Sequence, residues 1–134
     1  MFHDFTDPTI DLDGASILVT GGTGSFGRRF VRRLFERGRP RRVVIFSRDE
    51  QKHVAMMRDP AFRDRPEIRW FLGDVREAER LERAMAGVDL VVHAAAMKHI
   101  DLAEYNPFEC IRTNVVGAEN VVRAALANDV ERVI

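Results

Sequence analysis

The sequence predicts an α/β protein built on a doubly wound parallel sheet with helices on both faces. Two observations indicate this fold. Apolar runs of strand length alternate with segments of helical periodicity along residues 15–134, which is typical of a parallel sheet with right-handed crossovers. The first apolar run also passes through a glycine-rich turn directly into a helical segment. A fifth strand only begins, at residues 130–134, so the expected sheet is truncated at that strand.

Composition limits the classes of function. The 134 residues are the size of one domain, divided into a polar lead-in (1–14) and the domain proper (15–134). Lys and Arg total 21, as do Asp and Glu, and this balance argues against a nucleic-acid partner or a membrane surface. The lead-in has no apolar run long enough for a signal peptide or an anchor. A single cysteine, Cys110, allows no disulfide within the chain and suits a reducing cytoplasm.

The glycine-rich turn carries the most specific signal. Gly22-x-Gly24-x-x-Gly27 matches the fingerprint of dinucleotide-binding, Rossmann-like folds, and Gly21, Gly24 and Gly27 fit a variant with three-residue spacing. Such glycines allow a sharp turn after the strand at 16–20, close approach to a pyrophosphate, and tight packing of helix on strand. The N–H groups that open the helix at 26–37 then bind phosphate. A merely flexible turn would not explain these offsets.

The first helix combines an apolar stripe with a basic face. The stripe is expected to be buried and consists of Phe30, Val31, Leu34 and Phe35. Eight arginines lie between positions 28 and 42. We interpret them as a solvated helix face and a basic turn, and a polyanion-binding patch is the alternative that the neutral net charge disfavours.

The end of the second strand, residues 42–47, indicates the cofactor. Enzymes that use NAD usually place an acid here for the ribose 2′-hydroxyl, whereas this chain has Ser47 followed by Arg48, with Lys52 further on. These cations favour the 2′-phosphate of NADP. Asp49 could still reach the ribose, and Ser47 could equally be the N-cap of a helix at 50–58.

The third and fourth strands, at 67–72 and 89–96, end in further candidates. Asp74 could accept a hydrogen bond from the adenine amino group, or cap a helix at 77–86. Small side chains at the fourth strand tip would let a cofactor lie against it: Ala94, Ala95 and Ala96. His93 is interpreted as a packed histidine, and no spacing of metal-ligating residues indicates zinc.

A polar loop at 97–105 follows, and then a long helix at 107–128. Lys98 is expected to project into the crevice near the nicotinamide and the substrate, while His99 is an even choice between site and surface. Asn114 could fix the backbone of the fourth strand or the ribose. The buried side of the long helix is predicted to be Phe108, Ile111, Val115, Val122, Ala125 and Leu126.

With these residues in view, the chain resembles the extended short-chain dehydrogenase/reductase family, and within it the inverting UDP-N-acetylglucosamine 4,6-dehydratases. The resemblance covers nearly everything after residue 14. It is carried by residues 20–27, 46–52, 73–76 and 93–110, together with Thr113-Asn114.

The resemblance implies NADP, a UDP-sugar substrate, and a place in nucleotide-sugar and polysaccharide biosynthesis. Hydride would pass from sugar carbon 4 to NADP, water would be lost across carbons 5 and 6, and hydride would return to carbon 6. The oxidation acidifies the neighbouring proton, which an acid–base pair can then remove. The implied cofactor residues are Gly21, Thr23, Gly24, Ser25, Phe26, Gly27, Ser47, Arg48, Asp49, Glu50, Gln51, Lys52, Asp74, Val75, Ala94, Ala95, Ala96, Lys98 and Asn114, with Lys98 and His99 toward the substrate.

The chain departs from the family in its catalytic segment. Family members carry Tyr-x-x-x-Lys after the fifth strand, but the only tyrosine here is Tyr105, and the fourth residue after it is Glu109. We therefore expect this chain alone to bind cofactor without turning over substrate. A related nucleotide-sugar epimerase and a non-catalytic NADP-binding module are the alternatives. An unpaired sheet edge predicts self-association, as in a homo-oligomer.

Overall fold

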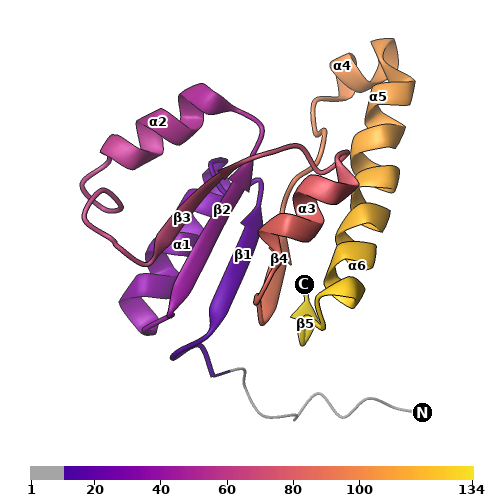
Figure 1. The fold of residues 1–134 in the computed structure, drawn as a ribbon. Helices are drawn as coiled ribbons and strands as arrows, with labels where there is room; N and C mark the ends of the chain where they lie inside the picture. The colour runs from indigo at the N-terminus through magenta and orange to yellow at the C-terminus, as the bar shows by residue number, and fades with distance from the viewer. Residues whose placement is uncertain (1–10) are drawn as a thin grey trace, which may run out of the picture.

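The computed structural model describes residues 11–134, and most of the predicted lead-in, residues 1–10, lies outside the described residues. Five parallel strands form one sheet in the order β3-β2-β1-β4-β5 (Figure 1). The chain runs outward from β1 to β3 and then crosses back to place β4 beside β1, so the strand order reverses between these two strands. The strands are β1 Ser16–Thr20, β2 Arg42–Ser47, β3 Ile68–Leu72, β4 Leu90–His93 and β5 Arg132–Val133.

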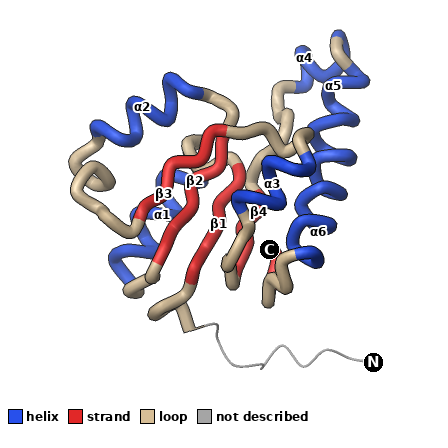
Figure 2. Tube along the Cα trace, viewed as in Figure 1, coloured by secondary structure: helices blue, strands red, loops and turns tan. Residues whose placement is uncertain are grey.

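Helices cover both faces of the sheet, which confirms the predicted fold class. The first pair, α1 Ser25–Arg37 and α2 Glu50–Arg58, covers one face, while α3 Ala78–Ala84 and α6 Gly117–Ala127 cover the other. Beyond the carboxyl ends of the strands stand α4 Ile100–Tyr105 and α5 Pro107–Ile111 (Figure 2). A π-helical segment, η1 Arg112–Val116, joins α5 to α6 in one continuous helical run.

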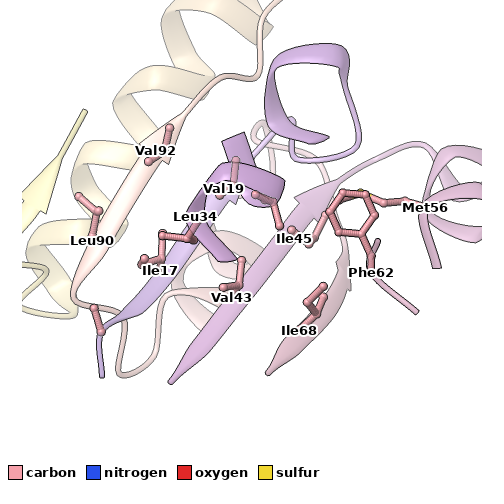
Figure 3. Packing of buried hydrophobic residues seen from close by; sticks show 12 residues of the cluster. Ile17, Val19, Leu34, Val43, Ile45, Met56, Phe62, Ile68, Leu90 and Val92 are labelled. Carbon is pink, nitrogen blue, oxygen red and sulfur yellow. The ribbon is translucent and has the colours of Figure 1, made fainter. Parts of the chain in front are cut away.

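The alternation of side chains along the strands builds two cores. On β1, Ile17 and Val19 point to the layer of α1 and α2 and belong to the same core as Leu34 and Met56 (Figure 3). Leu18 points to the opposite layer, formed by α3 and α6. All three β1 side chains are fully buried, and burying each contributes about 1.5–3 kcal/mol to the free energy of unfolding. The predicted stripe of α1 is confirmed for Val31 and Leu34, while its two phenylalanines are partly buried.

Several predicted boundaries need correction. The fourth strand ends at His93 rather than at residue 96, because Thr20 captures the next two N–H groups with its side chain. The third helix is Ala78–Ala84, shorter than 77–86. The stretch 97–105 is not all loop, because α4 occupies Ile100–Tyr105.

The buried side of the long helix was predicted wrongly. Five of its six predicted members are exposed: Phe108, Ile111, Val115, Val122 and Leu126. The last part of the helix, α6, instead packs through Gly117, Asn120, Val121, Ala124 and Ala125, and of the predicted set only Ala125 is buried. Gly117 shows the reason, because a Cβ there would lie 2.7 Å from Val75 Cγ2. The helix lies too close to the body of the domain for large side chains on that side.

Candidate functional site

A cavity of about 480 Å³ opens at the carboxyl ends of the strands, where the strand order reverses. Ligands of open α/β sheets bind at this position. The cavity brings together most of the predicted site residues. Its lining includes Gly21, Thr23, Gly24, Ser25, Phe26, Gly27, Ser47, Arg48, Asp49, Lys52, Asp74, Val75, Ala94, Ala95, Ala96, Lys98 and His99. Three predicted residues are not part of it: Glu50, Gln51 and Asn114.

The glycine-rich turn forms one wall through contacts that exclude side chains. Gly21 has a φ of +62°, a left-handed conformation, and a Cβ there would meet the main chain of Ala94 at 3.0 Å. At Gly27 a Cβ would lie 2.6 Å from the Cα and carbonyl oxygen of Gly22. The turn and the start of α1 therefore share one tightly packed backbone arrangement.

The start of α1 has the features of a phosphate site. Its N-cap is Gly24, and no side chain caps the helix, so the N–H groups of the first turn remain available to a ligand. These groups and the positive end of the helix dipole favour an anion. The cavity lining therefore fits the pyrophosphate of a dinucleotide.

Buried hydroxyl groups join the glycine turn to the end of β2. Thr23 Oγ1 and Ser47 Oγ share a hydrogen bond of 2.7 Å. Ser47 is not the N-cap of α2, as had been an alternative, because Asp49 holds that position and accepts a hydrogen bond from the Lys52 N–H at 3.0 Å. The Asp49 carboxylate also lies 3.8 Å from Lys52 Nζ, so it is already engaged by its own helix.

Arg48 and Lys52 supply positive charge at the same wall. Both side chains are more than half exposed, with 58% and 62% of their surfaces accessible. Arg48 Nη1 lies 3.8 Å from Asp74 Oδ2, so both residues belong to the same part of the cavity lining.

Asp74 is the most strongly paired carboxylate of the site. Its side chain is only 13% exposed, and Arg76 holds it with a main-chain N–H and two guanidinium hydrogen bonds. Burial works to raise the pKa of Asp74, but the Arg76 hydrogen bonds outweigh it, so the pKa lies below the ordinary 3.8. Asp74 is therefore an anion at neutral pH. It does not cap α3, whose N-cap is Glu77.

The opposite wall depends on the end of β4. Thr20 Oγ1 accepts hydrogen bonds from the N–H groups of Ala94 and Ala95 and lies 2.7 Å from His93 Nδ1. A hydroxyl has one proton to donate, so that proton goes to Nδ1 and the ring proton of His93 sits on Nε2. Burial lowers the pKa of His93 below 6.5, which also favours the neutral ring. His93 is thus a structural clamp, as the sequence suggested.

Asn114 fixes the loop that follows β4. Its Oδ1 accepts from the Met97 N–H at 2.8 Å, and its Nδ2 donates to the Met97 carbonyl at 3.1 Å. Neither predicted role is shown as such, because the bonded backbone belongs to the loop after β4 rather than to the strand. Asn114 lies in the π-helical segment, a feature that is frequent at functional sites.

Sequence reasoning missed several lining residues. Among them are Phe46, Met97, Leu102 and Thr113. Thr113 is buried, and its hydroxyl has no hydrogen-bond partner within the described part of the chain. An unsatisfied buried hydroxyl beside a cavity favours a polar ligand there. The Thr113-Asn114 pair had been noted, but a threonine inside a helical pattern gave no signal of its own.

Residues 11–134 show neither a membrane-spanning helix nor a metal-binding cluster. None of the helices in this range is long and apolar enough to cross a bilayer. The same range holds no grouping of three or more His, Cys, Asp or Glu side chains suited to a metal ion. Tyr105 is 87% exposed on α4 and does not line the cavity.

Comparison with known proteins adds a family and several relatives. Residues 17–134 match the model of a family described as polysaccharide biosynthesis protein. A UDP-N-acetylglucosamine 4,6-dehydratase (inverting) from Campylobacter jejuni is 50% identical over 119 residues, which are 89% of this chain and 35% of the relative. A UDP-glucose 4-epimerase from Rickettsia conorii is 43% identical over 122 residues, with 89% and 35% covered. An uncharacterized membrane protein from Methanocaldococcus jannaschii is 41% identical over the whole chain and 38% of its own length.

Solved structures give the same picture. Pen from Bacillus thuringiensis superposes with a TM-score of 0.87 at 38% identity, covering 93% of this chain and 38% of that one. DesIV, a dTDP-glucose 4,6-dehydratase from Streptomyces venezuelae solved with NAD and TYD bound, gives 0.74 at 30% identity, covering 88% and 38%. The chain thus spans little more than a third of the length of the relatives it matches.

Proposed function

Because the chain belongs to the polysaccharide biosynthesis protein family, within the short-chain dehydrogenase/reductases, we propose that it is the cofactor-binding part of an NADP-dependent, inverting UDP-N-acetylglucosamine 4,6-dehydratase. The observation that carries this proposal is the uncapped start of α1 facing one continuous cavity with Arg48, Lys52 and Asp74. When bound, the cofactor would accept and return the hydride.

In this proposal, different residues bind different parts of the cofactor. The first turn of α1 binds the pyrophosphate, and Arg48 and Lys52 bind the 2′-phosphate. Asp74 accepts a hydrogen bond from the adenine amino group. The buried hydroxyl of Thr113 serves a polar group of the cofactor near the loop after β4. Lys98 and His99 line the same cavity toward the expected UDP-sugar.

The chain alone is proposed to bind without catalysis. Deprotonation of a sugar hydroxyl needs a positioned base, and these 134 residues contain no Tyr-x-x-x-Lys motif, since the fourth residue after Tyr105 is Glu109. Tyr105 cannot substitute for it, because that side chain stands exposed outside the cavity lining.

The preference for NADP over NAD is the first property to test. Titration of the chain with both nucleotides should show tighter binding of NADP. Arg48→Ala should weaken NADP far more than NAD, by about 1.5–3 kcal/mol, because a charge-assisted hydrogen bond to the 2′-phosphate is lost. Arg63→Ala is a matched control, because Arg63 pairs with Asp64 outside the cavity. Equal or tighter NAD binding by the unaltered chain would remove the argument.

A nucleotide-sugar epimerase is the second candidate. It is supported by the 43% identity to a UDP-glucose 4-epimerase, which uses the same class of substrate by its name. The higher identity to a dehydratase favours the first candidate. Joining this chain to the remainder of a dehydratase relative and assaying water loss from UDP-N-acetylglucosamine would separate the two, since an epimerase would return only an inverted sugar.

Self-association and a cytoplasmic location complete the proposal. The exposed apolar face of the long helix, which includes Phe108, Val115 and Leu126, supports pairing with a second copy. Sedimentation of the purified chain tests this, and a stable monomer at high concentration would count against it. The single cysteine supports a reducing compartment.

A further inference from the structure

The carboxylate of Asp74 lies between two guanidinium groups that differ in position and tightness. Arg48 lines the cavity and approaches Asp74 Oδ2 to 3.8 Å. Arg76 donates to the same oxygen from Nη2 at 2.8 Å and from Nε at 3.0 Å, and its main-chain N–H reaches Oδ1 at 3.0 Å. Asp74 is thus satisfied chiefly by Arg76, and Arg48 is a second, looser partner.

Arg76 is itself held by a second carboxylate, that of Glu109. Its Nη1 donates to Glu109 Oε2 on α5, so that the guanidinium bridges the end of β3 and the helix across from it. The Arg76 side chain is 33% exposed, whereas that of Arg48 is 58% exposed. The bridged guanidinium is therefore the fixed one, and Arg48 is free to move toward a ligand.

Resting on the proposed NADP function, we propose that Arg76 is a positioning residue that sets the preference for the 2′-phosphate. It neutralises the Asp74 carboxylate and so leaves the Arg48 guanidinium available to the phosphate. Without Arg76, the carboxylate and the phosphate compete for Arg48, and the two anions repel each other across the adenosine end of the cavity. Selectivity between the two dinucleotides then falls, although Arg76 touches neither.

The test compares nucleotides that differ only in the 2′-phosphate. NADP and NAD are titrated into the unaltered chain and into Arg76→Gln, and adenosine 2′,5′-bisphosphate and AMP serve as smaller probes. Arg76→Gln should weaken NADP about two- to fivefold more than NAD, the range expected for loss of a partly exposed charge interaction. Arg76→Lys, which keeps the charge, should recover most of the selectivity.

A neighbouring arginine provides the control. Arg80 lies in the next helix, where its Nε donates to the Leu72 carbonyl at 2.9 Å and its guanidinium covers the Phe71 ring at 4.3 Å. Arg80→Gln removes the same charge without touching Asp74, so it should leave the ratio of NADP to NAD affinity unchanged. Equal weakening of both nucleotides in Arg76→Gln, or no weakening, would overturn the proposal.

A measurement without ligand separates this proposal from the proposed function. If Arg48 takes over the Asp74 carboxylate when Arg76 is lost, then Arg48→Ala should lower the free energy of unfolding more in the Arg76→Gln background than in the unaltered chain. Additive effects in urea unfolding would refute the exchange of partners. Failure of the unaltered chain to bind either dinucleotide would defeat the proposed function instead, while the unfolding cycle would still decide whether the guanidinium groups exchange.

Discussion

The two walls of the cavity are built in different ways. The glycine-rich wall is held by main-chain contacts so close that a single added methyl group meets backbone atoms at Gly21 and Gly27. The wall after β4 is held by side chains that reach across from elsewhere, namely Thr20 and Asn114. The first arrangement is made by main-chain atoms, within the turn at Gly27 and across to Ala94 at Gly21. The second is made by side chains whose hydrogen bonds join residues separated by 17 to 75 positions in the sequence. The glycine-rich wall is therefore fixed by main-chain packing, whereas the wall after β4 is fixed by side-chain hydrogen bonds.

Gly27→Ala should give the largest effect and tests the rigid wall. The new Cβ would meet the Gly22 backbone at 2.6 Å, and backbone cannot rotate away as a side chain can. We expect a loss of about 1–3 kcal/mol in the free energy of unfolding, as in other overpacked sites, and at least a tenfold loss in NADP affinity. Urea unfolding and nucleotide titration measure the two.

Gly14→Ala is the control for Gly27→Ala. Gly14 has a φ of +73°, and no heavy atom of residues 11–134, apart from its two chain neighbours, lies within 4 Å of the position of a Cβ there, so the substitution adds backbone strain without a clash in this part of the chain. It should cost stability and leave nucleotide affinity intact. If Gly27→Ala bound NADP like the unaltered chain, the wall would not be rigid.

Asn114→Ala should give a smaller effect, confined to the other wall. It removes both hydrogen bonds to Met97, about 0.5–1.5 kcal/mol each. The Met97 amide should exchange its proton faster with solvent, which hydrogen exchange detects. Binding of adenosine 2′,5′-bisphosphate should not change, because it is proposed to bind at Arg48, Lys52 and Asp74 rather than at the loop after β4.

Asn128→Ala matches Asn114→Ala in chemistry on the same helical run. Asn128 Nδ2 donates to the carbonyls of Glu82 and Ala124, away from the cavity. Its loss should lower stability by a similar amount without faster exchange at Met97. Faster exchange in both variants would mean that the loop responds to the helix as a whole rather than to Asn114.

The sequence predicts the glycine-rich wall, and much less of the wall after β4. The spacing of Gly22, Gly24 and Gly27 predicts a strand, a turn and a helix within a dozen residues, and the structure has all three. The bounds of β1, β2 and α2 were also predicted correctly, because each has its own pattern and its own stop signals. The site roles of the lining residues remain predictions.

The long helix shows why the remaining features could not be predicted from the sequence. Its apolar periodicity identifies an apolar face correctly, but periodicity does not say what that face meets. Val121 is buried and Val122 is half exposed, although they are neighbours of the same type. Close packing of Gly117 against Val75 decides which side turns inward, and that contact spans 42 positions of sequence.

The smallest effect concerns the pH response of the clamp at His93. Burial lowers the pKa of His93 in the folded chain below 6.5, its value when unfolded. Above pH 6.5 the ring is neutral in both states, and as the pH falls below 6.5 the unfolded chain takes up the proton first. The free energy of unfolding should therefore decline as the pH falls below 6.5. The full decline is about 1.4 kcal/mol for each unit by which folding lowers the pKa of His93.

Titration of the His93 ring by NMR and urea unfolding at pH 7.5 and 5.5 measure this response. His93→Gln should reduce the difference in unfolding free energy between the two pH values. A ring that titrates at or above 6.5 would contradict the neutral clamp and the placement of its proton on Nε2.

The π-helical turn at Arg112–Val116 gives the long helix two independent orientations. One additional residue per turn offsets everything before it by about 100° relative to a regular α-helix. The part after it packs against α3, while the part before it is held by the ion pair between Arg76 and Glu109 on α5. Deleting one residue from this turn would make the run a regular α-helix. Either α5 or α6 would then be rotated away from its present contacts. The two segments of the helical run therefore differ by a fixed rotation about the helix axis, and each is positioned by contacts with a different part of the domain.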